Sequence, residues 1–350
     1  MGKVLPWEVQ ERNRVLSCYD NWVSRKQNFK WVGFGVDMIA EGMDGVFLLD
    51  KPRGPSSRKA LNEFAKALPK GLKHGHAGTL DPLASGLLLV VTGKATRMIE
   101  LYQQFSKIYE ATIRFGATSQ TDDSEGPIEE IPDALPPGRD QLLEKLSLMV
   151  GELSQVPPAF SAVRIEGKRA YRLARSGKPK LAKPKIIKVH KFELLSHEGQ
   201  QAMVRWEVSS GTYIRSLARD LGAAIGTGAY LEGLVRTSIG PWSLANSITP
   251  GALALKDSPS WIPLDKSLVH FPKLVLGMPR SREILGGKKT VLGLDEDGGG
   301  SNEGMYLLTS CLGQNLGLVE VSKLPDQGVL VTPWKMFLHL GLLQTSIDFL

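Results

Sequence analysis

Residues 109–115 alternate strictly between apolar and polar side chains, and this period of two constrains the fold more than any other feature of the chain. The apolar set is Tyr109, Ala111, Ile113 and Phe115. Such alternation predicts a strand with one face buried and the other face in solvent. Residues 204–208 repeat the pattern and predict a second strand of this kind. We therefore expect a sheet that is covered on at least one face.

Other segments predict fully buried strands and amphipathic helices. Residues 46–50 and 86–93 are short, continuous apolar runs, which are typical of strands buried on both faces. Ser56 or Ser57 is suited to cap a helix, and the segment after Gly211 has apolar residues at helical spacing. The sequence therefore predicts a mixed protein of helices and strands, with a sheet that need not be parallel.

The chain divides into zones of different character. Residues 1–43 form an extension of mixed polarity, and residues 44–250 carry the strand and helix signals. Residues 251–264 have the composition of a connection, and residues 265–350 are β-prone with a glycine-rich interruption.

Composition excludes several classes of protein. No run approaches the roughly 18 apolar residues needed to span a membrane, and the first residues lack the apolar core of a signal peptide. The chain has only two cysteines, Cys18 and Cys311, which argues against a disulfide framework or a structural zinc site. We therefore expect a cytoplasmic protein without a membrane segment.

Positive charge is concentrated in two parts of the chain. The formal net charge is +7, from 43 Lys and Arg against 36 Asp and Glu. Residues 164–191 hold eleven basic residues and one acid, and residues 51–73 hold seven basic residues and one acid. Such clusters suit a polyanion, because each neutralised phosphate releases counterions. A solvated, lysine-rich surface has the same composition, so charge alone leaves both interpretations open.

The densest group of reactive residues is HGHAGTLDPLASG, residues 74–86, which we expect to form a loop before an apolar strand. Asp81 precedes Pro82, which restricts the backbone, and its carboxylate could act as a nucleophile or a general base. Asp before Pro is also a common turn device, and this is the more frequent reason for the pair. His76 is a candidate acid, base or stacking group. A metal site at His74 and His76 is rejected, because no other histidine lies nearby in sequence.

A second group, SGTYIR at residues 210–215, lies where a strand is expected to pass into a helix. From such a junction Tyr213 and Arg215 could face a cleft. Arg215 could pair with a carboxylate such as Asp81 and keep it ionised in a poorly solvated pocket. The alternative is an ordinary arginine in solvent at the start of a helix.

Six segments of the chain, in this order, resemble motifs of the TruB family of pseudouridine synthases. They are GVFLLDKPRGPSS (45–57), GHAGTLDPLASGLLLVVTGKATR (75–97), SKIYEATIRFGATSQTDDSEG (106–126), VPPAFSAVRIEGKRAYRLARSG (156–177), SGTYIRSLARDLG (210–222) and YLEGLVRTSIG (230–240). Each motif alone is modest evidence, whereas six motifs at family-like spacing are specific.

The resemblance implies catalytic roles for three residues. Asp81 would be the nucleophile, Arg215 would pair with it, and Tyr109 would stack on the target base.

The resemblance also implies a substrate-binding set, which comprises His76, Tyr213, Leu234, Lys51, Arg164 and Lys168. Leu234 would pack against a flipped base, and His76 would fill the space that the base leaves. Tyr213 would line the pocket, and Lys51 would support its floor. Arg164 and Lys168 belong to the basic stretch that could contact RNA phosphates.

The fold implied by the resemblance is α+β, with a mixed, largely antiparallel sheet and flanking helices. Residues 44–250 would be the catalytic domain, and residues 265–350 a small β-rich region similar to a degenerate PUA domain. The reaction would isomerise the uridine at position 55 in the T loop of tRNA, after base flipping, without cofactor, metal or guide RNA. The absence of G-x-G-x-x-G and Walker A sequences agrees with this expectation.

The T-stem loop of tRNA would be the binding partner, and we expect a monomer that needs no protein partner. Two alternatives stay open. The chain could be a tRNA-binding or folding factor in which catalysis is secondary, or the catalytic subunit of a guide-RNA-dependent complex. The set Asp81, Tyr109 and Arg215 argues against a purely binding role, and the long basic tail usual in guide-dependent relatives is missing from the sequence.

Family members commonly begin at a position equivalent to Met43. We therefore expect residues 1–42 to be an upstream misreading of the start codon rather than a functional arm.

Overall fold

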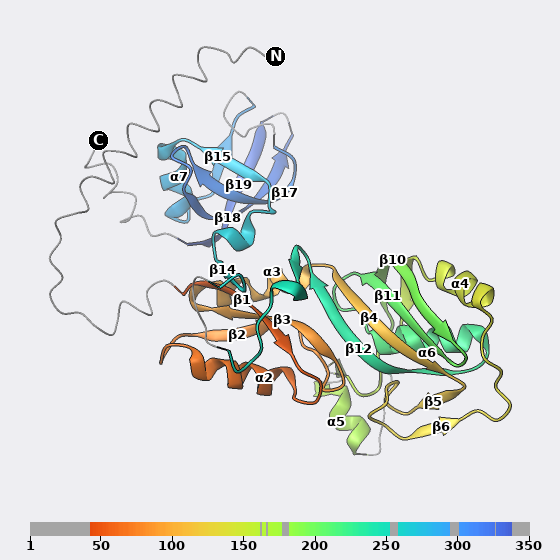
Figure 1. The fold of residues 1–350 in the computed structure, drawn as a ribbon. Coiled ribbons are helices and arrows are strands. Elements are labelled where there is room, and N and C mark those ends of the chain that lie inside the picture. The colour runs from red at the N-terminus through yellow and green to blue at the C-terminus, as the bar shows by residue number, and fades with distance from the viewer. Residues whose placement is uncertain are drawn as a thin grey trace, which may run out of the picture. The chain divides into compact units, whose positions relative to one another are not determined.

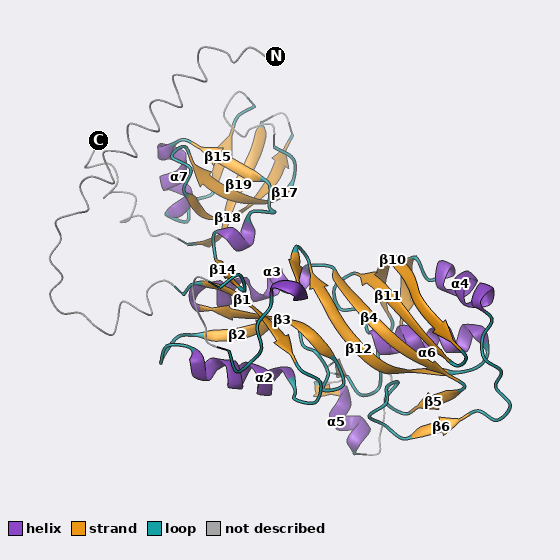
Figure 2. Cartoon of the chain, in the orientation of Figure 1, coloured by secondary structure: helices purple, strands orange, loops and turns teal. Residues whose placement is uncertain are grey.

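The computed structural model describes residues 43–161, 163–165, 167–176, 182–252, 258–294, 301–325 and 327–337. A ten-stranded sheet and a five-stranded sheet organise these residues (Figures 1 and 2). The expected extension at residues 1–42 lies outside the described part of the chain, and so does the end of the C-terminal zone.

The large sheet has the strand order β14-β1-β3-β12-β4-β11-β10-β7, with β2 beside β3 and β13 beside β12. Its strands are β1 Gly45–Lys51, β2 His74–Ala77, β3 Ser85–Thr92, β4 Lys107–Phe115, β7 Gly151–Gln155, β10 Lys185–Glu198, β11 Gln201–Val208, β12 Ala229–Ile239, β13 Trp242–Ser243 and β14 Trp261–Pro263. The pairing of β12 with β3 is parallel, and the other pairs in this sheet are antiparallel. The predicted mixed, largely antiparallel sheet is confirmed.

Short helices and two small ribbons accompany this sheet. The α-helices are α2 Ser57–Phe64, α3 Ile99–Gln104, α4 Arg139–Leu148, α5 Ala170–Arg175 and α6 Ile214–Ile225. The 3₁₀ turns are η3 Ala65–Ala67, η4 Gly93–Met98, η5 Leu244–Asn246 and η6 Lys266–Leu268. The ribbons pair β5 Ala117–Ser119 with β6 Ile128–Glu130, and β8 Arg164–Ile165 with β9 Lys168–Arg169.

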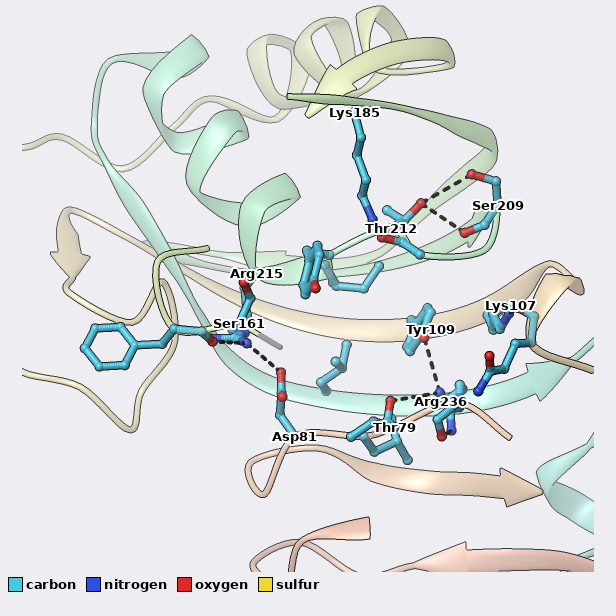
Figure 3. A pocket seen from close by; sticks show the side chains of 18 of the residues that line it. Thr79, Asp81, Lys107, Tyr109, Ser161, Lys185, Ser209, Thr212, Arg215 and Arg236 are labelled. Atoms are coloured by element: carbon cyan, nitrogen blue, oxygen red, sulfur yellow. Dashed lines mark hydrogen bonds and ion pairs between the residues drawn. The ribbon is translucent and has the colours of Figure 1, made fainter. Parts of the chain in front are cut away.

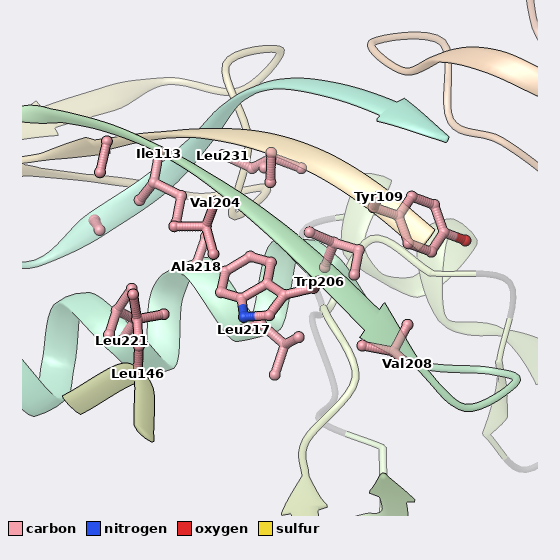
Figure 4. Close-up of a cluster of buried hydrophobic side chains, with 14 of the residues drawn as sticks. Tyr109, Ile113, Leu146, Val204, Trp206, Val208, Leu217, Ala218, Leu221 and Leu231 are labelled. Atoms are coloured by element: carbon pink, nitrogen blue, oxygen red, sulfur yellow. The ribbon is translucent and has the colours of Figure 1, made fainter. Parts of the chain in front are cut away.

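Helix α6 covers one face of the sheet where β4, β11 and β12 run together (Figure 4). Burial along β4 alternates without a break, and its predicted apolar face is the buried one. The helix contributes Ile214, Leu217 and Leu221 of its predicted stripe to this core. Trp206 of β11 is fully buried beneath the helix. The apolar face of the strands, which repeats every two residues, and the apolar face of the helix, which repeats every 3.6 residues, therefore pack together in one hydrophobic layer.

Strands β1 and β3 are buried on both faces, which explains their unbroken apolar sequences. Phe47, Leu49 and Val90 pack with α2, while the alternate residues of the two strands pack with η4 and α3. A strand covered on both sides has no face that favours polar side chains. These two strands fix the position of the loop between β2 and β3.

Two neighbouring serines at the start of α2 make different hydrogen bonds. Ser56 is the N-cap, and its Oγ accepts from the backbone N–H of Lys59 at 3.3 Å. Ser57 is buried and bonds instead to the backbone of Leu80. The sequence left both serines open as the cap, and only Ser56 has that role.

Two expectations for local structure are corrected. The segment expected to be a loop begins with a strand, β2, in which His76 lies opposite Val90. The segment 251–264, expected to be a connection, contains β14, which pairs with β1 at the edge of the large sheet. Strands of three or four residues are too short to show a period of two.

The β-prone C-terminal zone forms the five-stranded sheet. Its order is β15-β17-β18-β19-β16. Its elements are β15 Lys273–Leu276, α7 Met278–Leu285, β16 Thr290–Leu292, β17 Gly304–Ser310, β18 Asn315–Leu324 and β19 Gly328–Met336. This confirms a small β-rich C-terminal region, and its likeness to a PUA domain stays a prediction.

Within the described residues, the structure has no helix that is long and apolar enough to cross a membrane.

Candidate functional site

A cavity of about 610 Å³ opens where four segments of the large sheet and its loops converge (Figure 3). Five of the residues predicted for the site line it, namely Asp81, Tyr109, Tyr213, Arg215 and Leu234. They come from the loop before β3, from β4, from the start of α6 and from β12. Tertiary structure therefore brings together side chains that are up to 153 positions apart in the sequence, since 234 − 81 = 153.

The loop that carries Asp81 is held by backbone and side-chain hydrogen bonds. Ser57 Oγ donates to the carbonyl of Leu80 at 2.9 Å and accepts from its N–H at 2.7 Å. The N–H of Gly54 donates to the carbonyl of Pro82 at 2.8 Å. Lys51 Nζ, from the end of β1, donates to the carbonyl of Ala84 at 2.6 Å. The Asp-Pro turn is therefore built into the core rather than free on the surface.

Gly86 allows β3 to start directly after this loop. Its φ of +101° is unfavourable for other residues, and an added Cβ would lie 2.4 Å from the carbonyl oxygen of Arg236. Only glycine therefore lets β3 approach β12 this closely.

Asp81 and Arg215 form the predicted ion pair. Asp81 Oδ2 lies 3.0 Å from Arg215 Nη2. The side chain of Asp81 is 42% exposed, whereas that of Arg215 is 7% exposed. The carboxylate therefore faces the cavity while the guanidinium that pairs with it is fixed in the protein.

Further contacts orient Arg215. Its Nη1 lies 3.3 Å from Oδ2 of Asp123 and donates to the carbonyl of Thr121 at 3.0 Å. Its Nη2 also donates to the carbonyl of Phe160 at 3.1 Å. Asp123 is itself fixed by the hydroxyl of Thr121, which donates to Oδ1 at 2.6 Å. One guanidinium therefore bridges a buried carboxylate and a carboxylate open to the cavity.

Tyr109 presents its ring to the cavity and is backed by Arg236. The Arg236 guanidinium lies 5.9 Å from the centre of the Tyr109 ring, and its Nη1 is 3.5 Å from the phenol oxygen. Arg236 is fully buried and donates to the carbonyls of Leu87, Thr79 and Gly78. It therefore ties the β3 loop to the strand that carries Tyr109.

Tyr213 and Leu234 complete the wall. The backbone of Tyr213 is held by Gln155, whose amide both donates to its carbonyl and accepts from its N–H. Burial raises the pKa of the Tyr213 phenol, so the side chain is neutral near pH 7. Leu234 lies opposite Ala111 in the pairing of β12 with β4, which places it two residue pairs from the pair formed by Tyr109 and Arg236.

Known proteins with similar sequences identify this arrangement. A model of the TruB family pseudouridylate synthase N-terminal domain matches residues 66–214. A tRNA pseudouridine synthase B of Azoarcus sp. is 40% identical over 285 residues, which cover 79% of this chain and 91% of the relative. A tRNA pseudouridine synthase B of Thermotoga maritima is 36% identical over 261 residues, which cover 74% of this chain and 84% of the relative.

The chain belongs to the TruB family of pseudouridylate synthases.

Solved structures agree with this TruB family fold. A chain in a Cbf5-Nop10-Gar1 complex superposes with a TM-score of 0.64 at 24% identity, covering 90% of this chain and 93% of that chain. A chain in an H/ACA RNP bound to a substrate RNA containing 2′-deoxyuridine gives 0.64 at 23% identity, covering 89% and 92%. At these identities the likeness shows the fold.

Two predicted residues of this TruB family member lie outside the cavity lining. Lys51 is fully buried beneath the Asp81 loop, where its ammonium also donates to the carbonyl of Pro52. Burial lowers the pKa of Lys51, an effect that the nearby charge of Asp81 partly opposes. His76 is partly buried on β2, and its Nδ1 has no hydrogen-bond partner within the described residues. Burial lowers the pKa of His76, and the charges of Arg58 and Arg236 lower it further.

The predicted contacts of Arg164 and Lys168 remain predictions. The structure describes the backbone of these two residues, which lie on the paired strands β8 and β9, and not their side chains.

Asp123, which contacts Arg215 behind the cavity wall, and the lining residues Arg236 and Lys107 were not singled out from the TruB family sequence. Asp123 and Arg236 lie inside quoted motifs, but neither stood out by residue type alone. Lys107 also lines the cavity, and its ammonium donates to the carbonyls of Gln103 and Phe105. Burial, together with the charge of Arg236, lowers the pKa of Lys107 to about 8. Lys107 continues the alternation of residues 109–115 on the buried face, and a basic residue at such a position is the signal that could have found it.

The described residues contain no group of three or more His, Cys, Asp or Glu side chains placed to hold a metal ion.

Proposed function

We propose that this TruB family member converts the uridine at position 55 in the T loop of tRNA to pseudouridine, with Asp81 as the nucleophile. The observation that carries the proposal is the ion pair of Asp81 with Arg215 at 3.0 Å, on the wall of a cavity that also presents Tyr109. The relatives' name, tRNA pseudouridine synthase B, supports tRNA as the substrate.

The reaction needs no redox change and no group from another molecule. The bond between N1 and C1′ breaks, the uracil turns, and C5 bonds to C1′. The proton on C5 is lost, and N1 gains a proton. A nucleophilic carboxylate, held in place by a fixed guanidinium, can start this exchange without a cofactor.

The target base must leave its stack before Asp81 can reach it. Flipping costs a few kcal/mol, and stacking on an aromatic platform such as Tyr109 returns about 1–3 kcal/mol. Leu234 would contact the base beside Tyr109, since the two residues line the same cavity. The size of the cavity leaves room for a nucleotide and for groups that bind it.

We further propose that residues 44–250 carry the catalytic activity and that the protein acts as a monomer in the cytoplasm, without guide RNA or an obligatory protein partner. The similarity to named tRNA enzymes over 79% of the chain supports this choice over the guide-dependent alternative. The tRNA-folding alternative is compatible with the same RNA-binding surface, and the Asp81 variant described in the Discussion separates it from catalysis.

The test uses the purified full-length protein and an unmodified tRNA transcript, with no added RNA or protein. We expect pseudouridine at position 55 and at no other uridine, as mapped by chemical modification and primer extension. Conversion that requires a guide RNA, or modification at a different uridine, would refute this assignment. Light scattering of the free protein and of its tRNA complex measures the oligomeric state in the same preparation.

A further inference from the structure

The cavity carries more positive charge than its own carboxylate neutralises. Its lining contains one carboxylate, Asp81, and the four cationic side chains Lys107, Lys185, Arg215 and Arg236. Asp81 pairs with Arg215. Within the described part of the chain, the other three cations have no carboxylate at ion-pair distance. Because a desolvated cation is costly without an opposite charge, this wall favours an anionic group of the substrate.

Lys185 has more unused N–H donors than the other two cations. Lys107 donates to two carbonyls, and Arg236 donates to three. Lys185 donates to one acceptor among the described residues, the carbonyl of Gly211. An ammonium group has three N–H donors, so Lys185 retains capacity for a ligand.

The ammonium of Lys185 also lies at the cavity wall. The Nζ lies 4.8 Å from the centre of the Tyr213 ring, which is part of the wall. Figure 3 shows Lys185 entering from the side opposite Asp81, with its end beside Thr212. Burial lowers the pKa of Lys185, and no carboxylate of the described residues opposes this effect. A bound anion would favour the charged form and offset the desolvation.

Two hydroxyl groups, those of Ser209 and Thr212, lie on the loop between β11 and α6, and the carbonyl of Gly211 in this loop accepts from the Lys185 ammonium. Ser209 Oγ accepts from the backbone N–H of Lys188 at 2.8 Å, which leaves its own O–H to donate. It lies 3.5 Å from Thr212 Oγ1, which is long for an O–H···O hydrogen bond, and the Thr212 hydroxyl donates instead to the backbone carbonyl of Ser209 at 3.0 Å. Both residues line the cavity. The Lys185 ammonium and the Ser209 hydroxyl are suitable donors for the oxygens of a phosphodiester.

We propose that Lys185, with the hydroxyl of Ser209, binds a backbone phosphate adjacent to the target uridine. This subsite rests on the proposed function, because it assumes that a flipped uridine occupies the cavity. The phosphate would be held on one side of the cavity while Asp81 and Arg215 lie on the other (Figure 3). The contact fixes the position of the nucleotide and reads no base.

The test removes the negative charge of the phosphate and the positive charge of Lys185, one at a time and together. T-stem-loop hairpins carry either natural linkages or a neutral methylphosphonate on the 5′ or the 3′ side of the target uridine. For the wild-type protein, one of the two neutral linkages should lower kcat/KM by about tenfold, as expected for the loss of a charge-assisted hydrogen bond. Lys185→Gln should lower kcat/KM on the natural hairpin to a similar degree. The kcat/KM of this variant should then fall no further when the hairpin carries the neutral linkage to which the wild type is sensitive.

Lys188 offers a matched control on the same strand. Burial alternates from Lys185 to Val189, so the side chain of Lys188 leaves the opposite face of β10. Lys188→Gln removes the same charge and should keep the full wild-type sensitivity to the neutral linkage. Lys185→Arg should recover most of the activity that Lys185→Gln loses, because it restores a cation at this position.

Salt provides a second readout. Each phosphate contact contributes about 0.7 to 0.9 to the slope of log affinity against log salt concentration. Lys185→Gln should reduce the slope by about this amount, measured on the natural hairpin and in Asp81→Asn protein so that no turnover occurs.

Three outcomes would overturn the subsite. They are a wild-type protein that tolerates both neutral linkages, a Lys185→Gln variant as sensitive to the linkage as the wild type, and a Lys188→Gln variant that loses the sensitivity. A wild-type protein that tolerates both neutral linkages refutes the subsite even if a variant folds poorly. Failure of the wild type on the natural hairpin would count against the proposed function instead.

Discussion

Nη2 of Arg215 lies 3.0 Å from Oδ2 of Asp81, and this contact joins the first turn of α6 to the loop before β3. The other terminal nitrogen of the guanidinium lies 3.3 Å from Asp123. The two carboxylates differ in access, since the side chain of Asp81 is 42% exposed and that of Asp123 is 3% exposed. The geometry suits Asp81 to react and Asp123 to position the arginine between them.

Replacing the exposed carboxylate should remove the chemistry and spare the RNA interface. For Asp81→Asn we expect a fall in kcat of at least about 1,000-fold, because an amide is not a nucleophile. The dissociation constant for tRNA should change little, since Asp81 makes no predicted phosphate contact. Release of tritium from C5-labelled uridine measures the rate, and filter binding measures affinity. Turnover close to that of the wild type would refute the role of Asp81.

Replacing the buried carboxylate should act through the position of Arg215. Asp123→Asn weakens one of its two ion pairs, and we expect kcat to fall by about 10- to 100-fold with a smaller change in KM. Glu193→Gln is the control, because Glu193 pairs with Arg205 on an exposed part of the sheet and should leave kcat unchanged. An unchanged kcat for Asp123→Asn would show that Asp81 and the backbone carbonyls hold Arg215 sufficiently.

Loss of Arg236 should destabilise the fold as well as the site. Arg236→Ala leaves the carbonyls of Gly78, Thr79 and Leu87 without their donor and opens a void beneath Tyr109. We expect the free energy of unfolding to fall by about 3–5 kcal/mol, measured by urea denaturation. Arg282→Ala, at an exposed arginine of α7, should change it by less than about 0.5 kcal/mol. Equal effects of the two variants would contradict the structural role of Arg236.

The buried ammonium of Lys107 should make stability depend on pH in the alkaline range. Its pKa falls from 10.5 to about 8 on folding, so between these values the unfolded chain binds more protons at this residue than the folded protein does. The free energy of unfolding therefore gains a contribution that rises with pH across this window, by at most about 3 kcal/mol.

Lys107→Met removes this group and tests the dependence. The difference in unfolding free energy between wild type and variant should move in favour of the wild type as the pH rises from 7.5 to 10. Urea denaturation at both pH values measures it, and subtraction cancels the other titrating groups. A difference that stays constant with pH would show that Lys107 keeps an ordinary pKa in the folded protein.

Local patterns determined much of this protein from sequence alone. The alternation of residues 109–115 specified which face of β4 is buried, because a strand presents successive side chains to opposite sides. The apolar spacing after Gly211 specified α6 for the corresponding reason. The family motifs supplied the fold and the candidate nucleophile Asp81, although a lone Asp-Pro pair has no such meaning.

The tertiary structure decided what the site is made of. Arg236 is a single arginine in a strand, and nothing local indicates that it donates to two carbonyls of a loop and one of β3, all more than 140 positions earlier. Strand β14 could not be predicted either, because three residues are too few to show an alternation of apolar and polar side chains. Lys185 could not be told apart from the other lysines of its basic stretch by sequence alone. Chain neighbours determine periodicity and caps, whereas distances such as that between Asp81 and Arg215 depend on how the whole sheet packs.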